Sequence, residues 1–276
     1  MCKYLGAPMK TWRVLRGYLR ATFHLALIVV PVLGLLVATS ATGRIGAGAG
    51  LAVGVALLAR ACFIYWPGFD PLFRVPWRGP LRGGRMAITF DDGPNGAATE
   101  KILDVFARHG AKATFFLIGE NVDRQPELAR RIAREGHAVG SHTYSHQKLS
   151  RIPLREATSE IDRGHEALVR AGVPDARLFR APHGLKTFAV VRHLDAAGLR
   201  MVAWTAGVYD TDCPSGRLIA RRARAWIRAG AILLLHDGKL GHERRPLLEA
   251  LPEILAEARA RGLELVTVPE LLGWTS

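Results

Sequence analysis

The sequence predicts an α/β fold with parallel strands, preceded by a membrane region. From residue 85 onward, short apolar runs alternate with amphipathic segments, which is typical of repeated strand–helix units and hence of a barrel or a doubly wound sheet. Before residue 67, two long apolar runs carry very little charge. We therefore expect an N-terminal membrane region (residues 1–66), a juxtamembrane linker (67–84) and a globular domain (85–276).

The chain is strongly basic, with a formal net charge of +14. Such a balance favours an anionic partner, either a nucleic acid or a membrane surface. No recognition helix or RNA-binding module is found in the sequence, so we expect no nucleic-acid partner. The three cysteines, Cys2, Cys62 and Cys213, are far apart, which argues against a disulfide framework or a thiolate metal site.

Two segments of the membrane region are long enough to cross a bilayer. Residues 22–42 and 45–66 each provide about 20 mostly apolar residues, and Arg60 is the only charged residue of the second segment. We expect a hairpin of two transmembrane helices with a short turn near Arg44. A secretory signal peptide is the alternative for the first run, but the second apolar run argues against it.

The arginines that flank these segments predict their orientation. Basic residues precede the first segment and follow the second, whereas only Arg44 lies between the two. By the positive-inside rule, both ends and the globular domain lie on the cytoplasmic face. We therefore expect a multi-pass protein of the bacterial inner (cytoplasmic) membrane. If the second segment lies in the membrane interface instead of spanning, the domain faces the other side.

Helix start and stop signals support the alternation within the globular domain. Gly110, Gly136 and Gly172 directly follow three amphipathic segments, and Pro126 opens one of them. The predicted helices are residues 99–109, 126–135, 154–171, 188–197, 218–229 and 247–261. The predicted strands are residues 85–90, 113–118, 137–141, 178–179, 201–205, 231–235 and 263–268.

The first predicted strand ends at two adjacent carboxylates, Asp91 and Asp92, and Gly93-Pro94 then forces a turn. Adjacent side chains of a strand point to opposite sides, so Asp91 and Asp92 should have different roles. A solvated Asp-Gly turn is the alternative interpretation. In a parallel barrel the strand ends that carry function meet at one end. Four more polar residues follow predicted strands: His142, Arg180, Asp210 and His236.

The pair His142 and His146 predicts a metal site. Residues four apart face the same side of a helical turn, so both imidazoles can bind one divalent ion. Asp92, at another strand end, can supply a carboxylate. Two histidines and one carboxylate leave open positions on zinc, as a catalytic site needs. We expect Zn, with Co, Ni or Mn as alternatives.

Four separated motifs occur in order: Thr89-Phe90-Asp91-Asp92-Gly93-Pro94, His142 with His146, Arg180-Ala181-Pro182-His183-Gly184, and Leu234-Leu235-His236. Together they resemble the polysaccharide deacetylase family, also described as the NodB-homology or carbohydrate esterase family 4 domain. The resemblance covers roughly residues 84–270. It implies a distorted (β/α) barrel that removes an N-acyl group from an amino sugar in a metal-dependent reaction.

The resemblance also implies roles for individual residues. Asp92, His142 and His146 would be the metal ligands. Asp91 would be the general base that takes a proton from the attacking water, and His236 the general acid that protonates the leaving amine.

The same resemblance implies supporting residues around these groups. Arg180 would hold Asp91, and Asp210 would pair with His236 or with Arg180 and keep His236 protonated. Pro182, His183 and Leu234 would contact the substrate, with Leu234 lining the pocket for the acyl methyl group.

The sequence departs from the family pattern at three positions. Gly207 stands where an aspartate is frequent, Thr211 where a tryptophan is frequent, and His183 where a tyrosine is common. These departures concern the sugar pocket more than the reaction.

The combined expectation is a membrane-anchored, metal-dependent N-deacetylase. Its substrate would be a lipid-linked sugar or a cell-envelope glycan, with membrane lipids as a second partner. The nearest alternative is a deformylase of a lipid-linked formamido sugar. An alternative of another class is a catalytically silent membrane sugar-binding protein.

Overall fold

The computed structural model describes residues 53–59, 62, 75–238 and 243–274. The chain divides into two units, residues 1–66 and 67–276. The first predicted transmembrane segment lies outside the described residues, as does most of the second, so both stay predictions. Residues 53–59 are helical, and none of the helices within the described part of the chain has the length and apolar character needed to cross a membrane.

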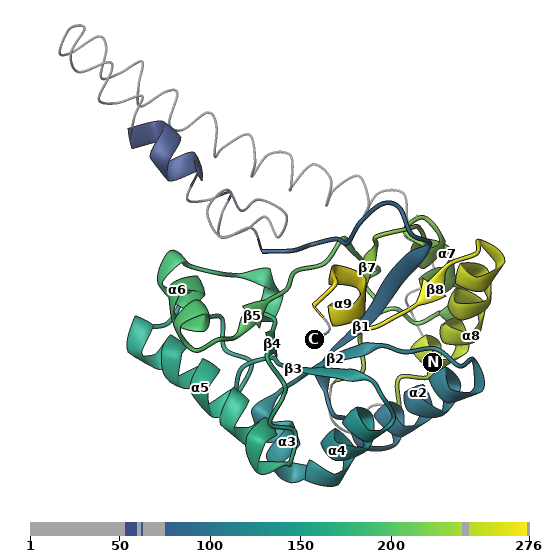
Figure 1. Ribbon diagram of the computed structural model, residues 1–276, viewed down its shortest axis with the longest axis horizontal. Coiled ribbons are helices and arrows are strands. Elements are labelled where there is room, and N and C mark those ends of the chain that lie inside the picture. The colour runs from purple at the N-terminus through teal and green to yellow at the C-terminus, as the bar shows by residue number, and fades with distance from the viewer. Residues whose placement is uncertain (1–52, 60–61, 63–74, 239–242, 275–276) are drawn as a thin grey trace, which may run out of the picture. The chain divides into compact units, whose positions relative to one another are not determined.

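The second unit is built on an eight-stranded sheet in the order β5-β4-β3-β2-β1-β7-β6, with β8 paired to the start of β1. Every pairing between these strands is parallel, which confirms the predicted strand–helix alternation (Figure 1). The strands are β1 (Arg85–Gly93), β2 (Thr114–Leu117), β3 (Ala138–Ser141), β4 (Leu178–Phe179), β5 (Arg200–Met201), β6 (Ala206–Gly207), β7 (Ile232–His236) and β8 (Glu264–Leu265).

Helices surround the strands, and α9 lies at one end of the barrel (Figure 1). The described helices are α2 (Gly96–Arg108), α3 (Gly119–Arg124), α4 (Pro126–Arg134), α5 (Leu154–Arg170), α6 (Phe188–Ala196), α7 (Gly216–Arg224), α8 (Arg245–Ala260), α9 (Val268–Leu272) and the 3-10 turn η1 (Pro182–Gly184).

Alternation along β1 separates two cores. Met86, Ile88 and Phe90 pack outward against the helices, whereas Ala87 packs inward with Phe116, Val202, Ile232 and the α9 residue Leu271. A strand buried on both faces reads as a continuous apolar run, as this one does. By the same alternation, the inward-facing side chains near the C-terminal end of β1 also point into the barrel.

Of the strand predicted over residues 201–205, only Met201 lies in a strand, at the end of β5, and β6 begins one residue after the predicted end; the prediction is wrong in its extent. The backbone N–H of Ala203 donates to the carbonyl of Pro76, and that of Thr205 donates to Ile232. The segment thus changes partner midway, which interrupts the ladder between β4 and β7. The result is an open barrel rather than a closed one.

The last predicted strand, residues 263–268, is also shorter than expected. It ends at Leu265, because Thr267 caps α9 together with Glu270: the Thr267 side chain accepts from the Glu270 N–H, and the Glu270 carboxylate accepts from the Thr267 N–H. This capping box precedes a proline at the start of the helix, a pattern that the sequence contains.

Candidate active site

The end of β1 carries a β-bulge that changes the expected direction of one carboxylate. Asp91 follows the inward alternation, but the register with β2 shifts between Asp91 and Gly93, and Asp92 has a φ of 75°. Both carboxylates therefore approach the same imidazole: His142 Nε2 lies 3.8 Å from Asp91 Oδ2 and 3.4 Å from Asp92 Oδ1. The expectation that they point to opposite sides is wrong, because the bulge adds a residue and rotates Asp92 inward.

Two glycines allow the chain after β7 to pass close to this bulge. A Cβ on Gly93 would lie 2.3 Å from a carboxylate oxygen of Asp237, and a Cβ on Gly238 would lie 1.9 Å from Asp92 Cβ. The backbone N–H groups of Asp237 and Gly238 both donate to the carbonyl of Asp91. The ends of β1 and β7 are thus fixed against one another.

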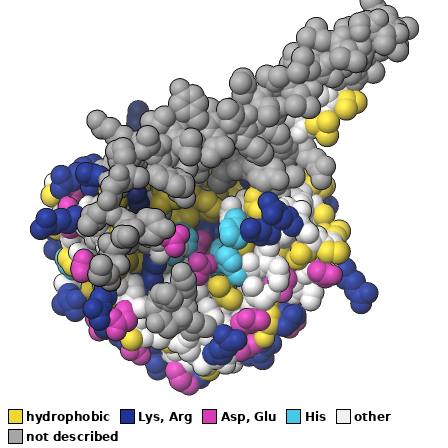
Figure 2. Space-filling view, turned by 180° about the vertical axis from the view of Figure 1, so that it is seen from behind, with side chains coloured by type: hydrophobic (Ala, Val, Ile, Leu, Met, Phe, Trp, Pro, Cys, Tyr) yellow, Lys and Arg dark blue, Asp and Glu magenta, His cyan; other side chains and the backbone are white. Residues whose placement is uncertain are grey.

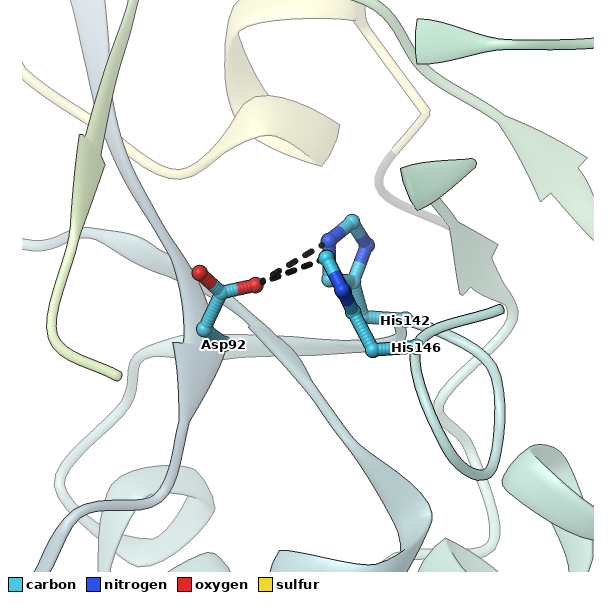
Figure 3. Close-up of side chains that lie close together, drawn as sticks. All are labelled: Asp92, His142 and His146. Carbon is cyan, nitrogen blue, oxygen red and sulfur yellow. Dashed lines mark ion pairs between the residues drawn. The ribbon is translucent and has the colours of Figure 1, made fainter. Parts of the chain in front are cut away.

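The loop after β3 supplies two histidines without forming a helical turn. His142 continues the strand, and its N–H donates to Leu117. Thr143 and His146 have φ values of 67° and 61°, and the Thr143 hydroxyl accepts from the His146 N–H at 3.0 Å. The predicted helical turn is therefore wrong. Both imidazoles still face the same side, as predicted, because left-handed backbone at these positions folds the loop back on itself. Figure 3 shows both imidazoles facing Asp92.

Asp92, His142 and His146 form a cluster that fits a divalent cation. Asp92 Oδ1 lies 3.4 Å from His142 Nε2 and 3.2 Å from His146 Nε2, and one ligand atom from each residue lies within 4.8 Å of the others. This oxygen is buried and forms no hydrogen bond with the described residues. A buried carboxylate oxygen without a donor is expected where a cation completes its coordination.

Hydrogen bonding and charge prepare these ligands. His142 Nδ1 donates to the carbonyl of Arg180 at 2.7 Å, which leaves Nε2 with its lone pair toward Asp92. Burial alone would raise the pKa of Asp92, but the imidazoles of His142 and His146 beside Oδ1 lower that pKa far below its usual range. Asp92 is therefore a carboxylate at any physiological pH.

Arg180 holds Asp91 from inside the barrel. Its side chain is fully buried and donates to Asp91 Oδ1 at 2.8 Å, to the Thr89 hydroxyl at 2.7 Å and to the Ala203 carbonyl at 3.0 Å. Its guanidinium carbon also lies 4.0 Å from the ring centroid of Phe116. A cation fixed by this many partners restricts Asp91 to one orientation.

His236, at the end of β7, is held by Asp210. Asp210 Oδ1 accepts from His236 Nδ1 and Asp210 Oδ2 accepts from the His236 N–H, both at 3.0 Å. Burial lowers the pKa of His236, but the hydrogen bond and the charge of Asp210 more than offset it and raise the pKa to about 9. Asp210 was expected to pair with His236 or with Arg180, and in the structure it pairs with His236.

Arg244 is a site residue that sequence reasoning missed. Its guanidinium donates to Asp210 Oδ2 at 2.6 Å, to the carbonyl of His236 at 3.1 Å and to that of Thr211 at 3.0 Å. Its backbone is left-handed, with a φ of 51°. No motif marks this arginine among its basic neighbours; only the folded chain places it against Asp210.

Asp237 is a second residue that the motifs left without a role. It is fully buried and accepts from the Thr99 hydroxyl at 2.5 Å, and its backbone carbonyl accepts from the Asn95 side chain. Burial raises the pKa of Asp237 to about 7. This carboxyl joins the end of β7 to the start of α2 beneath the site.

The residues expected to contact substrate lie at the same end of the barrel. The ring centroids of His183 and His146 lie 5.0 Å apart. His183 directly follows Pro182 and has a left-handed backbone, with a φ of 58°. Leu234 is 7% exposed and pairs in register with Thr89, on the inward side of β7 like His236. A space-filling view shows histidine and acidic side chains beside one another in a hollow of this face (Figure 2).

Comparison with known proteins identifies the family. The family model described as "Polysaccharide deacetylase" matches residues 78–202. A chitooligosaccharide deacetylase from Bradyrhizobium sp. (strain ANU 289) is 39% identical over 216 residues, which cover 74% of this chain and 98% of that protein. A peptidoglycan-N-acetylglucosamine deacetylase from Bacillus cereus is 33% identical over 193 residues, which cover 70% of this chain and 70% of that protein.

Solved structures agree with this assignment. The Bc1960 peptidoglycan N-acetylglucosamine deacetylase, solved in complex with a naphthalenyl N-oxidanyl-benzamide, has a TM-score of 0.69 and is 32% identical; the match covers 73% of this chain and 94% of that chain. The resemblance inferred from the motifs and the parallel half-barrel are thereby confirmed. This chain belongs to the polysaccharide deacetylase family and is a carbohydrate N-deacetylase.

Proposed function

We propose that this protein removes the N-acetyl group from N-acetylglucosamine residues of a cell-envelope glycan, with a divalent cation held by Asp92, His142 and His146. The observation that carries the proposal is the convergence of these three ligand atoms on one point, with the unpartnered Asp92 oxygen among them. The relatives named for chitooligosaccharide and for peptidoglycan N-acetylglucosamine support the choice of sugar.

Amide hydrolysis needs an activated water, a polarised carbonyl and a protonated leaving group. A cation bound to two imidazoles and a carboxylate polarises the carbonyl and lowers the pKa of water. Zinc is the ion that this donor set favours, and Co, Ni and Mn accept the same ligands. Two further side chains, the carboxylate of Asp91 and the imidazole of His236, then transfer the protons.

Asp91 is the proposed general base. Arg180 fixes the orientation of its carboxylate through Oδ1, and Oδ2 faces His142 at 3.8 Å. The oxygen not bonded to Arg180 therefore lies at the cation cluster, where it can take a proton from the attacking water.

His236 is the proposed general acid. With a pKa of about 9, its imidazole carries a proton at neutral pH. Because Asp210 engages Nδ1, the proton on Nε2 is the one that can pass to the departing amine.

The membrane anchor and the topology belong to this proposal as well. We assign residues 22–42 and 45–66 to the bilayer and the domain to the cytoplasmic face, on the basis of apolar length and arginine flanks. A reporter enzyme fused after Trp66 measures the topology, and activity only in the periplasm would refute the cytoplasmic assignment. A lipid-linked amino sugar is the alternative form of the substrate, and the direction in which the site faces relative to the membrane decides between the two.

Alanine substitution of the ligands tests the proposal. Asp92→Ala and His142→Ala should each lose bound metal and acetate release from N-acetylated chitooligosaccharide, because each removes one of three ligands. Matched controls are Asp195→Ala, in α6, and His109→Ala, directly after α2; neither residue belongs to the cluster. Full acetate release by either ligand variant would reject the metal assignment.

Two further measurements separate the alternatives. Release of formate and acetate from substrates that differ only in the acyl group distinguishes a deformylase from a deacetylase. Sugar binding without turnover, measured after the protein has been loaded with zinc, would instead indicate a silent binding protein.

A further inference from the structure

The barrel end opposite the candidate site carries arginine–tryptophan pairs. In each pair a guanidinium carbon lies about 5 Å from an indole ring centroid, a cation–π geometry. Three of the chain's six tryptophans take part. The pairs are Arg78 on Trp77 (4.6 Å), Arg228 on Trp226 (4.9 Å) and Arg200 on Trp274 (5.0 Å). We call these six residues, with Leu81 and Arg82, the Arg–Trp face.

Backbone contacts place these residues at the N-terminal ends of the strands. The N–H of Gly79 donates to the carbonyl of Gly230 at 2.8 Å, and Arg78 forms an antiparallel bridge with Ala231, just before β7. Arg200 is the first residue of β5, and Trp274 follows α9. Asp92, His142 and His236 lie at the opposite, C-terminal ends of the strands.

The Arg–Trp face has unpaired positive charge beside exposed apolar surface. Arg78, Arg82 and Arg228 are exposed and form no ion pair with any described residue, whereas their neighbour Arg85 pairs with Glu264. Leu81 is 61% exposed. Stacked indole and guanidinium groups beside an exposed leucine match a lipid headgroup layer, where the ring meets the acyl boundary and the cation meets phosphate.

The position of the chain before this face indicates the partner. The apolar run that ends at Trp66 is separated from Trp77 by ten residues, 67–76, which reach at most about 35 Å when extended. A bilayer that holds this run therefore lies within reach of the Arg–Trp face. We propose that the Arg–Trp face docks the catalytic domain onto the anionic headgroups of that bilayer.

Docking by this face directs the active site away from the lipid. β1 has nine residues, so its two ends are about 26 Å apart. The site then opens toward a glycan that extends away from the membrane, and a sugar held at the headgroup layer does not reach it. Docking in this orientation therefore favours an extended glycan over a short lipid-linked sugar as the substrate of the proposed reaction.

Fluorescence quenching in vesicles tests the docking. The full chain, with Cys2, Cys62 and Cys213 replaced by alanine, receives a single labelled cysteine at Leu81 or at Leu154. Leu154 is 52% exposed and begins α5, at the catalytic end. The protein is reconstituted into vesicles that contain a headgroup quencher, made of zwitterionic lipid with or without anionic lipid. We expect quenching at Leu81→Cys in anionic vesicles and none at Leu154→Cys.

Charge removal provides the matched comparison. Arg78→Gln, Arg82→Gln and Arg228→Gln together should lower the docking equilibrium constant about 100-fold, at about fivefold per arginine. Arg155→Gln, Arg192→Gln and Arg217→Gln remove the same charge elsewhere and should leave quenching unchanged. Acetate release from a soluble chitooligosaccharide shows that both triple variants are folded.

Three outcomes would overturn the inference. The first is equal quenching at the two labels, and the second is quenching at Leu81→Cys that does not depend on anionic lipid. The third is a label at Leu81→Cys that lipid does not quench but whose fluorescence changes when polyphosphate is added. That result would identify a polyanion as the partner.

Discussion

At the scale of single residues, the hydrogen bond between Asp210 and His236 controls the acid of the proposed reaction. It raises the pKa of His236 from 6.5 to about 9 against the effect of burial. The protonated form is the active one, so kcat/KM should fall as the pH rises through about 9.

Replacing Asp210 with asparagine should move this alkaline limb to lower pH. Without the carboxylate, burial and the loss of charge both lower the pKa of His236, so the acid loses its proton earlier. A pH profile of kcat/KM measures the shift, with the exposed neighbour Asp212→Asn as control. An unchanged limb in Asp210→Asn would exclude His236 as the group that titrates.

Arg244 acts on the same pair from the other side. Arg244→Gln leaves Asp210 without its guanidinium partner, which should raise the pKa of His236 further and move the limb to higher pH. It should also lower kcat on the order of 10- to 100-fold through poorer placement of His236, with little change in KM. Arg245→Gln, an exposed neighbour, is the control. A limb that moves to lower pH would contradict this role.

Arg180 illustrates the cost of a buried charge. Arg180→Met removes the partner of a carboxylate that is 3% exposed, and an unpaired buried charge typically costs about 3–5 kcal/mol. Denaturant unfolding followed by circular dichroism measures the loss, with the exposed Arg192→Met as control. Equal stability of the two variants would show that Asp91 is solvated without Arg180.

At the scale of elements, the close contact between the ends of β1 and β7 positions the metal ligands. Gly238→Ala places a methyl group 1.9 Å from Asp92 Cβ, so either Asp92 or the chain after β7 must move. We expect loss of metal binding and of activity while the barrel stays folded. At Gly198 a Cβ meets nothing within 4 Å, so Gly198→Ala should cost only backbone strain of roughly 1 kcal/mol and keep its metal. Metal content measured after purification distinguishes the two, and normal metal in Gly238→Ala would contradict the prediction.

At the scale of the whole molecule, the cation would join two segments that are distant in sequence, the end of β1 and the loop after β3. Chelation should abolish acetate release and lower the unfolding temperature, because ligand binding to the folded state stabilises it. The two apolar cores lie on either side of the sheet and hold the barrel without the cation, so the far-UV spectrum should persist. Activity retained in protein shown to be free of metal would reject the dependence.

The sequence by itself determined most of the order of strands and helices, the family, and most of the residues that meet at the site. Apolar periodicity and glycine and proline signals are local, and local signals survive in a linear sequence. For the same reason Asp92, His142, His146, Arg180 and His236 were recognised from short motifs.

Only the tertiary structure decided how these residues face one another. The bulge at Asp92 lies against Gly238, which is 146 residues later in the sequence. The left-handed loop that presents His146 lies 54 residues after Asp92, and Arg244 contacts Asp210 across 34 residues. Close packing between distant segments sets these details, because the energy of a contact depends on both partners and neither partner's sequence contains it alone.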